Sequence, residues 1–250
     1  MEGPLLVALT PLVFGVAFLY SSVGHGGASG YLALLSLFGA PSTAIASTAL
    51  LLNVLVAGVA WWNYGRAGHS RWRLLLSFVL TSVPAAFFGG WLKVSGAVYS
   101  WALAAVLAAA AARFFLHLPS ALQEPVKAPS LWAASTTGSG IGFLSGMVGV
   151  GGGIFLSPLA LLLRWSTVKE TSALSAGFIV VNSVAGLVGR GVGGTLEMGV
   201  LLWLVPAAFA GGLLGSSLGS RRFSGPLLRR LLGVVLLVAS GKLAFTSLSG

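Results

Sequence analysis

Long uninterrupted apolar runs dominate the chain, and short polar segments separate them. Residues 3–65 contain no Lys, Arg, Asp or Glu, and neither do residues 128–163. A helix needs about 20 apolar residues to span a bilayer, so each stretch is long enough for more than one crossing. Because the runs are continuously apolar rather than alternating, they indicate membrane helices and not the strands of a barrel.

Charges and turn residues divide the chain into ten expected helical segments. These are 4–23, 27–39, 43–64, 74–92, 94–112, 130–147, 151–163, 171–189, 198–220 and 226–248. The segments 27–39 and 151–163 are short for a full span, and each either crosses or re-enters the membrane. The expected fold is an all-α integral membrane protein with about 8–10 transmembrane or half-spanning helices.

The two halves of the chain carry the same motifs in the same order. Val23–Ala28 matches Val148–Gly153, the surroundings of Asn53 match those of Asn182, and Val83–Gly90 matches Val205–Gly212. Five segments in each half make the second half enter the membrane from the opposite side, which predicts an inverted repeat. The expected division is a first repeat over 1–118, a loop over 119–129 and a second repeat over 130–250.

Composition and charge agree with a membrane location. Charged residues make up 7 % of the chain, against about 25 % in a soluble domain. Of the 14 lysines and arginines, all but Lys93, Arg190 and Lys242 fall in loops on one side. The positive-inside rule makes that side cytoplasmic and puts both termini outside, as expected for a multi-pass protein of a bacterial inner membrane. The net charge of +10 therefore indicates topology and lipid contact rather than nucleic-acid binding.

Two glycine-rich turns are the candidate substrate site. The first turn contributes Gly24, His25, Gly26, Gly27 and Ser29, and the second contributes Gly149, Gly151, Gly152 and Gly153. Glycine allows positive φ, and a turn that opens a helix presents unpaired N–H groups and the positive end of the helix dipole to an anion. The alternative is that these glycines only let helices pack closely.

Isolated polar side chains inside the apolar segments extend this candidate site. Ser172 lies near the start of one long segment, and Asn53 and Asn182 lie about a turn or two further into their segments. Amides and hydroxyls there can replace part of an anion's water shell or bond a neighbouring helix. Apart from tyrosines, His25 is the only ionisable residue in residues 3–65. It either bonds an anion or carries a proton, or it is a neutral structural histidine.

Several classes of protein are disfavoured. The chain has no Asp and no Cys, and its four glutamates, Glu2, Glu124, Glu170 and Glu197, lie in or near loops. A carrier of metal cations usually needs an acidic group in the membrane. Without a phosphate-binding Gly-Lys-Ser/Thr sequence or a catalytic cluster, we expect no ATP-driven pump, no enzyme, no bound metal and no cofactor.

The chain resembles the sulfite exporter TauE/SafE family. The residues that carry the resemblance are Val23–Leu32, Gly146–Gly153 and Pro158. The resemblance implies a permease for sulfite, sulfoacetate and related organosulfur or small organic anions, working by secondary transport and usually by export. The family's first motif more often reads Gly-x-Gly-Gly-Gly, whereas Ala28 follows Gly26 and Gly27 here.

The resulting hypothesis is a secondary transporter, expected to export small anions such as sulfite or organosulfonates, with its site between the two turns. Expected partners are the small anion, the lipid bilayer and protons as a coupling ion. The alternatives are a non-transport membrane scaffold or assembly protein, and a metal-cation permease.

Overall fold

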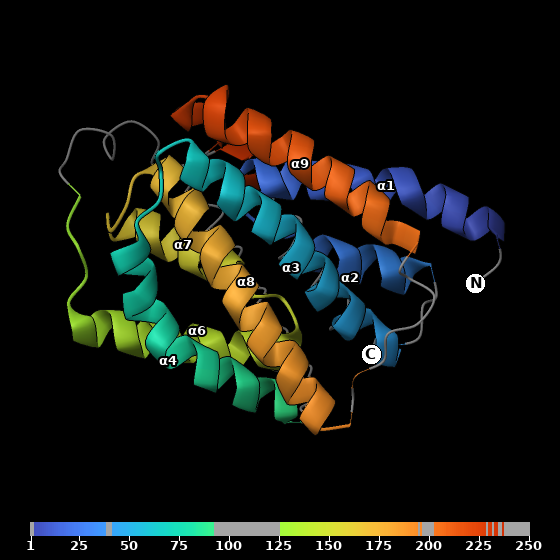
Figure 1. Ribbon diagram of the computed structural model, residues 1–250, viewed down its shortest axis with the longest axis horizontal. Helices are drawn as coiled ribbons and strands as arrows, with labels where there is room; N and C mark the ends of the chain where they lie inside the picture. Colours follow the sequence, from blue (N-terminus) through green and yellow to red (C-terminus); the bar gives the residue numbers. More distant parts are fainter. Residues whose placement is uncertain are drawn as a thin grey trace.

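The computed structural model describes residues 3–38, 42–92, 126–194 and 203–228, with the single positions 196, 230, 231, 233, 234 and 237. Over these residues the regular structure is helical and no strand is present. Figure 1 shows the arrangement. The helices are α1 (Gly3–Ser22), α2 (Ala28–Leu37), α3 (Ser42–Arg66), α4 (Trp72–Trp91), α6 (Leu131–Val148), α7 (Gly153–Leu162), α8 (Val168–Val192) and α9 (Val205–Arg221).

The predicted segments within these residues coincide with helices. The segment 94–112 and most of 226–248 lie outside the described residues. Three helices contain spans long and apolar enough to cross a membrane, namely Ile45–Arg66, Trp72–Trp91 and Val168–Val192. Shorter apolar stretches cover Ala8–Ser22 and Gly153–Leu162. The chain is therefore a helical integral membrane protein.

The helices α2 and α7 are half-length elements. Each has 10 residues, which at 1.5 Å per residue gives about 15 Å. The hydrocarbon core of a bilayer is about 30 Å thick, so neither helix is long enough to cross it. Each half-helix follows one of the two glycine turns.

The long helices form two groups that meet along α3 and α8. In Figure 1, α1 and α9 lie side by side at one edge and α4 and α6 at the other, with α3 and α8 crossing between them. Leu50 of α3 lies beside Gly186 of α8, and Trp61 lies beside Gly177. The residue numbers of these contacts increase along α3 while they decrease along α8, so the two helices are antiparallel.

Glycine stripes bring the outer helix pairs into close contact. On α6, Gly138, Gly142 and Gly146 each face a backbone carbonyl of α4, belonging in turn to Phe78, Ser82 and Ala86. On α9, Gly211, Gly215 and Gly219 face carbonyls of α1, those of Phe14, Phe18 and Ser22. In each pair the contacting residue numbers increase together, four residues at a time on both helices, so the two helices of each pair run parallel. Only glycine leaves room for this approach, which is the small-residue packing common in membrane helices.

One end of the molecule gathers the basic loops. The side chain of Arg71 donates to the backbone oxygen of Trp165 at 3.4 Å and lies 3.7 Å from Glu170. Lys169 donates to the backbone oxygen of Ser220 at 3.1 Å, which ties the start of α8 to the end of α9. Loops that lie far apart in the sequence therefore meet at this end, which we call the basic end.

Pro206 lies at the start of a helix and does not kink one. It stands in the first turn of α9, which begins at Val205. Proline is well tolerated there because the N–H it lacks would have no acceptor within the helix. Pro84, by contrast, is inside α4.

Candidate functional site

The first glycine turn closes α1 with a Schellman motif. The N–H of His25 donates to the backbone oxygen of Tyr20 at 2.9 Å, and the N–H of Gly24 donates to that of Ser21 at 3.0 Å. Gly24 has φ +76°, the left-handed conformation this motif requires. A Cβ on Gly24 would collide with the backbone of Ser172 in α8. The turn therefore needs glycine for its conformation and for its contact with the other half of the chain.

The second glycine turn repeats this arrangement between α6 and α7. Gly149 ends α6 with φ +82°, and Gly151 and Gly152 also have positive φ. The nearest neighbour of a Cβ on Gly149 would be Ala46, near the start of α3. Each turn thus lies against the first turns of the long helix in the opposite half.

Asn53 of α3 stands between the two turns. Its Oδ1 accepts a hydrogen bond from the N–H of Ala28, the first residue of α2, at 2.9 Å. A Cβ on Gly26 would collide with the Asn53 side chain, whereas a Cβ on Gly151 would stand 2.7 Å from Asn53 Nδ2. Both turns are therefore in contact range of one fully buried amide.

Further buried polar atoms gather around Gly151. A Cβ there would stand 2.8 Å from Ser183 Oγ of α8. Asn182 uses its Nδ2 to bond the backbone oxygen of Phe178 at 2.8 Å. Asn53 Nδ2, Asn182 Oδ1 and Ser183 Oγ are among the buried side-chain atoms that have no hydrogen-bond partner within the described residues. We call Gly26, Gly151, Asn53 and Ser183 the polar centre.

Unpaired polar atoms in a protein interior are expensive. Each costs about 1–3 kcal/mol, and most buried polar groups in folded proteins are paired. Two donor groups, Asn53 Nδ2 and the Ser183 hydroxyl, are left over on either side of Gly151. The arrangement is suited to a small polar solute that supplies the missing bonds.

His25 also links the two halves of the chain. Its Nδ1 lies 3.1 Å from the backbone oxygen of Val23, which can only accept, so Nδ1 carries the proton. In the neutral ring Nε2 then accepts from the Ser157 hydroxyl of α7 at 3.3 Å. Ser157 in turn lies 2.6 Å from the Ser175 hydroxyl of α8. A buried hydrogen-bonded chain thus runs from the first turn into the second half.

Other predicted site residues have local partners instead. The Ser29 hydroxyl bonds that of Tyr20 at 2.9 Å, and Ser172 Oγ donates to the backbone oxygen of Val168 at 3.1 Å. Cβ atoms on Gly27, Gly152 and Gly153 would meet the side chains of Tyr31, Phe178 and Ile179. The first N–H of α2, expected to be open to an anion, is taken by Asn53. These predicted site residues therefore shape the two turns. The hydrogen-bond donors that remain unpaired at the polar centre are the side chains of Asn53 and Ser183.

Sequence reasoning missed Ser183, Ser157 and the position of Arg190. Arg190 lies within α8, where its Nη2 donates to the backbone oxygens of Met147 at 3.0 Å and Gly146 at 3.4 Å. Tyr64 of α3 makes the corresponding bond to the backbone oxygen of Ser22 at the end of α1. Two features of the sequence could have indicated these residues. Ser183 directly follows Asn182, and an arginine is stabilised near the C-terminal end of a helix by the helix dipole.

Long apolar helices around a buried polar centre, with half-helices behind glycine turns, define a polytopic membrane protein of the transporter class. The chain belongs to the sulfite exporter TauE/SafE family, whose model matches residues 9–243. It is therefore a membrane transporter.

Two curated relatives carry names consistent with this class. The "Probable membrane transporter protein y4hK" of Sinorhizobium fredii is 36 % identical over 240 residues, covering 95 % of this chain and 97 % of that relative. The "Probable membrane transporter protein YunE" of Bacillus subtilis is 30 % identical over 105 residues, covering 42 % of this chain and 38 % of that relative. No solved structure matches the chain.

Proposed function

We propose that this chain is a secondary transporter that exports small anions, such as sulfite or an organosulfonate, through the polar centre. The observation that carries the proposal is the position of Asn53, which both glycine turns approach and whose Nδ2 remains unpaired among the described residues. Substrate bonded there touches α3, α8 and the second turn at once. A change in how the two halves pack would therefore change access to it.

The donors at the centre favour an anion over a cation. Asn53 Nδ2 and the Ser183 hydroxyl offer N–H and O–H groups, and sulfite and sulfonate oxygens accept such bonds. The chain has four acidic residues, and the one that the structure describes, Glu170, is occupied in capping α8, where it accepts from the N–H of Thr167 at 2.8 Å. A neutral donor set also binds an anion loosely enough for release.

Inverted repeats over 1–118 and 130–250, joined by the loop 119–129, form the proposed transport machinery. Exchanging α1 with α6, α2 with α7, α3 with α8 and α4 with α9 maps the packed helix pairs onto one another, except that the packing of α1 with α2 has no equal counterpart between α6 and α7. In this pattern α4 of the first half packs with α6 of the second, and α9 of the second half packs with α1 of the first. Each half therefore contributes one helix to the group formed by the other half. Rocking of the two groups about α3 and α8 is the proposed basis of alternating access.

Orientation and direction follow from the basic end. We place it in the cytoplasm of a bacterium, with the chain in the inner membrane and both termini outside. An inside-negative membrane potential drives an anion outward by about 2.3 kcal/mol per charge per 100 mV. Export then needs no other energy source.

Proton coupling through His25 is the variant of this proposal, in place of export driven by the membrane potential alone. The chain of His25, Ser157 and Ser175 crosses from one half to the other, so a change in the protonation of Nε2 alters a bond between the halves. A protonated ring can no longer accept from Ser157. Proton binding and the packing of α7 against the first turn would thereby be linked.

Anion-dependent thermal stability of the purified protein, backed by anion efflux from proteoliposomes, tests the proposal. The anions are sulfite, sulfate, thiosulfate, a small sulfonate and chloride. The test variant is Gly151→Ala, which places a methyl group against Asn53 and Ser183, and Gly194→Ala is its control. Both glycines have positive φ, but a Cβ at position 194 meets nothing within 4 Å.

The expected result is a selective rise in melting temperature with one oxyanion, together with its efflux. Both effects should be lost in Gly151→Ala and kept in Gly194→Ala. Equal shifts for every anion, or full efflux by a folded Gly151→Ala protein, would refute the site. If no anion changes the melting temperature of the intact protein or leaves the proteoliposomes, the result would favour a scaffold or a cation permease.

A further inference from the structure

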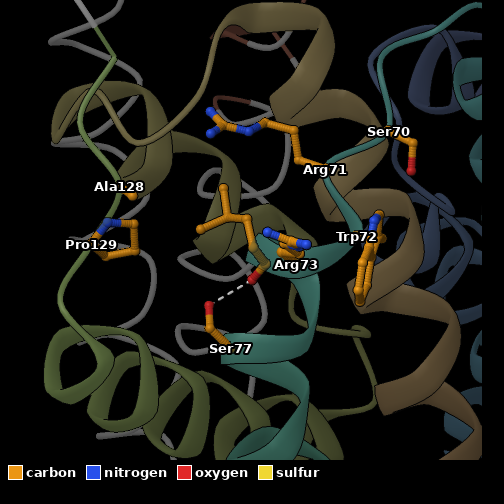
Figure 2. Close-up of a pocket in the computed structure, with 8 residues that line it drawn as sticks. Ser70, Arg71, Trp72, Arg73, Ser77, Ala128 and Pro129 are labelled. Carbon is orange, nitrogen blue, oxygen red and sulfur yellow. Dashed lines mark hydrogen bonds between the residues drawn. The ribbon is translucent and has the colours of Figure 1, made fainter.

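A cavity of about 400 Å³ opens at the basic end, beside the first turn of α4. It lies between the first turn of α4 and residues 128–129, just before α6. Figure 2 shows the residues around it, with Arg71, Arg73 and Ser77 from the α4 side and Ala128 and Pro129 from the other. The transport mechanism proposed above makes no use of this cavity.

The cavity offers positive charge and backbone donors. Arg71 is held by Trp165 and Glu170, whereas Arg73 has no ion pair with a described residue and lies 5.5 Å above the ring of Trp72. The N–H groups in the first turn of any helix have no acceptor within that helix. At the start of α4 no side chain of the N-cap residue accepts from them either. The backbone and the Arg73 guanidinium therefore both favour an anion here.

Apolar side chains continue the cavity toward the membrane. On α4, Trp72, Leu76 and Leu80 recur every four residues and are 59 %, 45 % and 74 % exposed. At the start of α6, Leu131 and Trp132 are 78 % and 82 % exposed. An exposed apolar stripe in a membrane protein faces lipid, and tryptophan at its end marks the headgroup level. A ligand that matches both the cationic cavity and the apolar stripe has an anionic head and an apolar tail.

We propose that this cavity binds the headgroup phosphate of an anionic phospholipid, whose acyl chains lie along Trp72, Leu76 and Leu80. Arg73 and the first turn of α4 hold the phosphate, and Ala128 and Pro129 form the opposite wall. A free phosphate ion would use the same donors but not the apolar stripe. The lipid would fix the start of α4 against the segment that leads into α6.

Native mass spectrometry of the detergent-solubilised protein with added phosphatidylglycerol tests this assignment. Arg73→Gln removes the positive charge at position 73, and Ala128→Phe fills the cavity without changing any charge. Arg66→Gln is the matched control, because Arg66 lies 5.6 Å above Trp62 at the same end but does not line the cavity. We expect Arg73→Gln to lower the lipid-bound fraction about five-fold, Ala128→Phe to lower it similarly, and Arg66→Gln to leave it unchanged.

The other results would overturn the proposal. Equal losses in Arg66→Gln and Arg73→Gln would mean attraction to the whole basic end, and equal retention of phosphatidylcholine would remove the role of charge. Displacement of the lipid by millimolar inorganic phosphate or glycerol phosphate would assign the site to a free anion. Melting temperatures of all variants are recorded without lipid, and Ala128→Phe decides the matter if Arg73→Gln does not fold.

Discussion

The side-chain oxygen of Asn53 accepts a hydrogen bond from the N–H of Ala28 at 2.9 Å, so α3 caps the half-helix α2. The same amide directs its Nδ2 toward Gly151 in the other half. One side chain thus combines a structural bond on its oxygen with an unpaired donor on its nitrogen. A substitution that keeps the oxygen and replaces the nitrogen separates the two roles.

Asn53→Asp is expected to abolish anion transport while α2 stays capped. Aspartate retains an acceptor for Ala28, but it replaces the donor with an oxygen and adds a negative charge that repels an anion. Loss of one buried donor alone corresponds to about a tenfold loss in binding. Efflux from proteoliposomes measures the effect. Asn63→Asp is the control, since Asn63 bonds Ser216 and Ser217 near the basic end. Similar loss in both variants would contradict the assignment.

Much of this fold follows from the sequence, because each apolar run has the length and composition of a helix. The half-helices behind Gly24 and Gly149 were predictable from short runs that start at glycine. The pairing of α4 with α6 was not, since it depends on carbonyls approaching Gly142 and Gly146 from another segment. Asn53 was found as an isolated amide in an apolar run. Ser183 was not, because only the packing of α8 against the second turn brings it to the centre.

Two glycines of α6 should respond to alanine in opposite ways. A Cβ on Gly142 would collide with the backbone oxygen of Ser82, whereas a Cβ on Gly140 meets nothing within 4 Å. Gly142→Ala should lose about 1–3 kcal/mol through overpacking. Gly140→Ala should gain about 0.5–1 kcal/mol, because alanine restricts the unfolded backbone and favours helix. Thermal or denaturant unfolding in detergent compares them. Equal effects would show that α4 and α6 do not make this contact.

Ser157→Ala should separate proton movement from anion binding. The variant removes the hydroxyl that bonds His25 Nε2 and leaves the polar centre intact. We expect the anion-dependent rise in melting temperature to persist, while proton flux accompanying anion efflux falls. A pH-sensitive dye inside proteoliposomes reports that flux. Ser139→Ala is the control, because Ser139 bonds only carbonyls of its own helix. Unchanged proton flux in Ser157→Ala would exclude this hydrogen-bonded chain as the route.

Arg190 should stabilise the second glycine turn through the end of α6. Its guanidinium donates to the backbone oxygens of Gly146 and Met147, just before Gly149 reverses the chain. A cation at a helix C-terminus contributes up to about 2 kcal/mol when partly buried, so Arg190→Leu should lower stability by about 1–2 kcal/mol. It should also speed amide hydrogen exchange at Gly149–Gly151. Arg221→Leu, at an exposed arginine in the last turn of α9, should change neither. Exchange at the turn that is unaffected in Arg190→Leu would mean that α6 ends independently of Arg190.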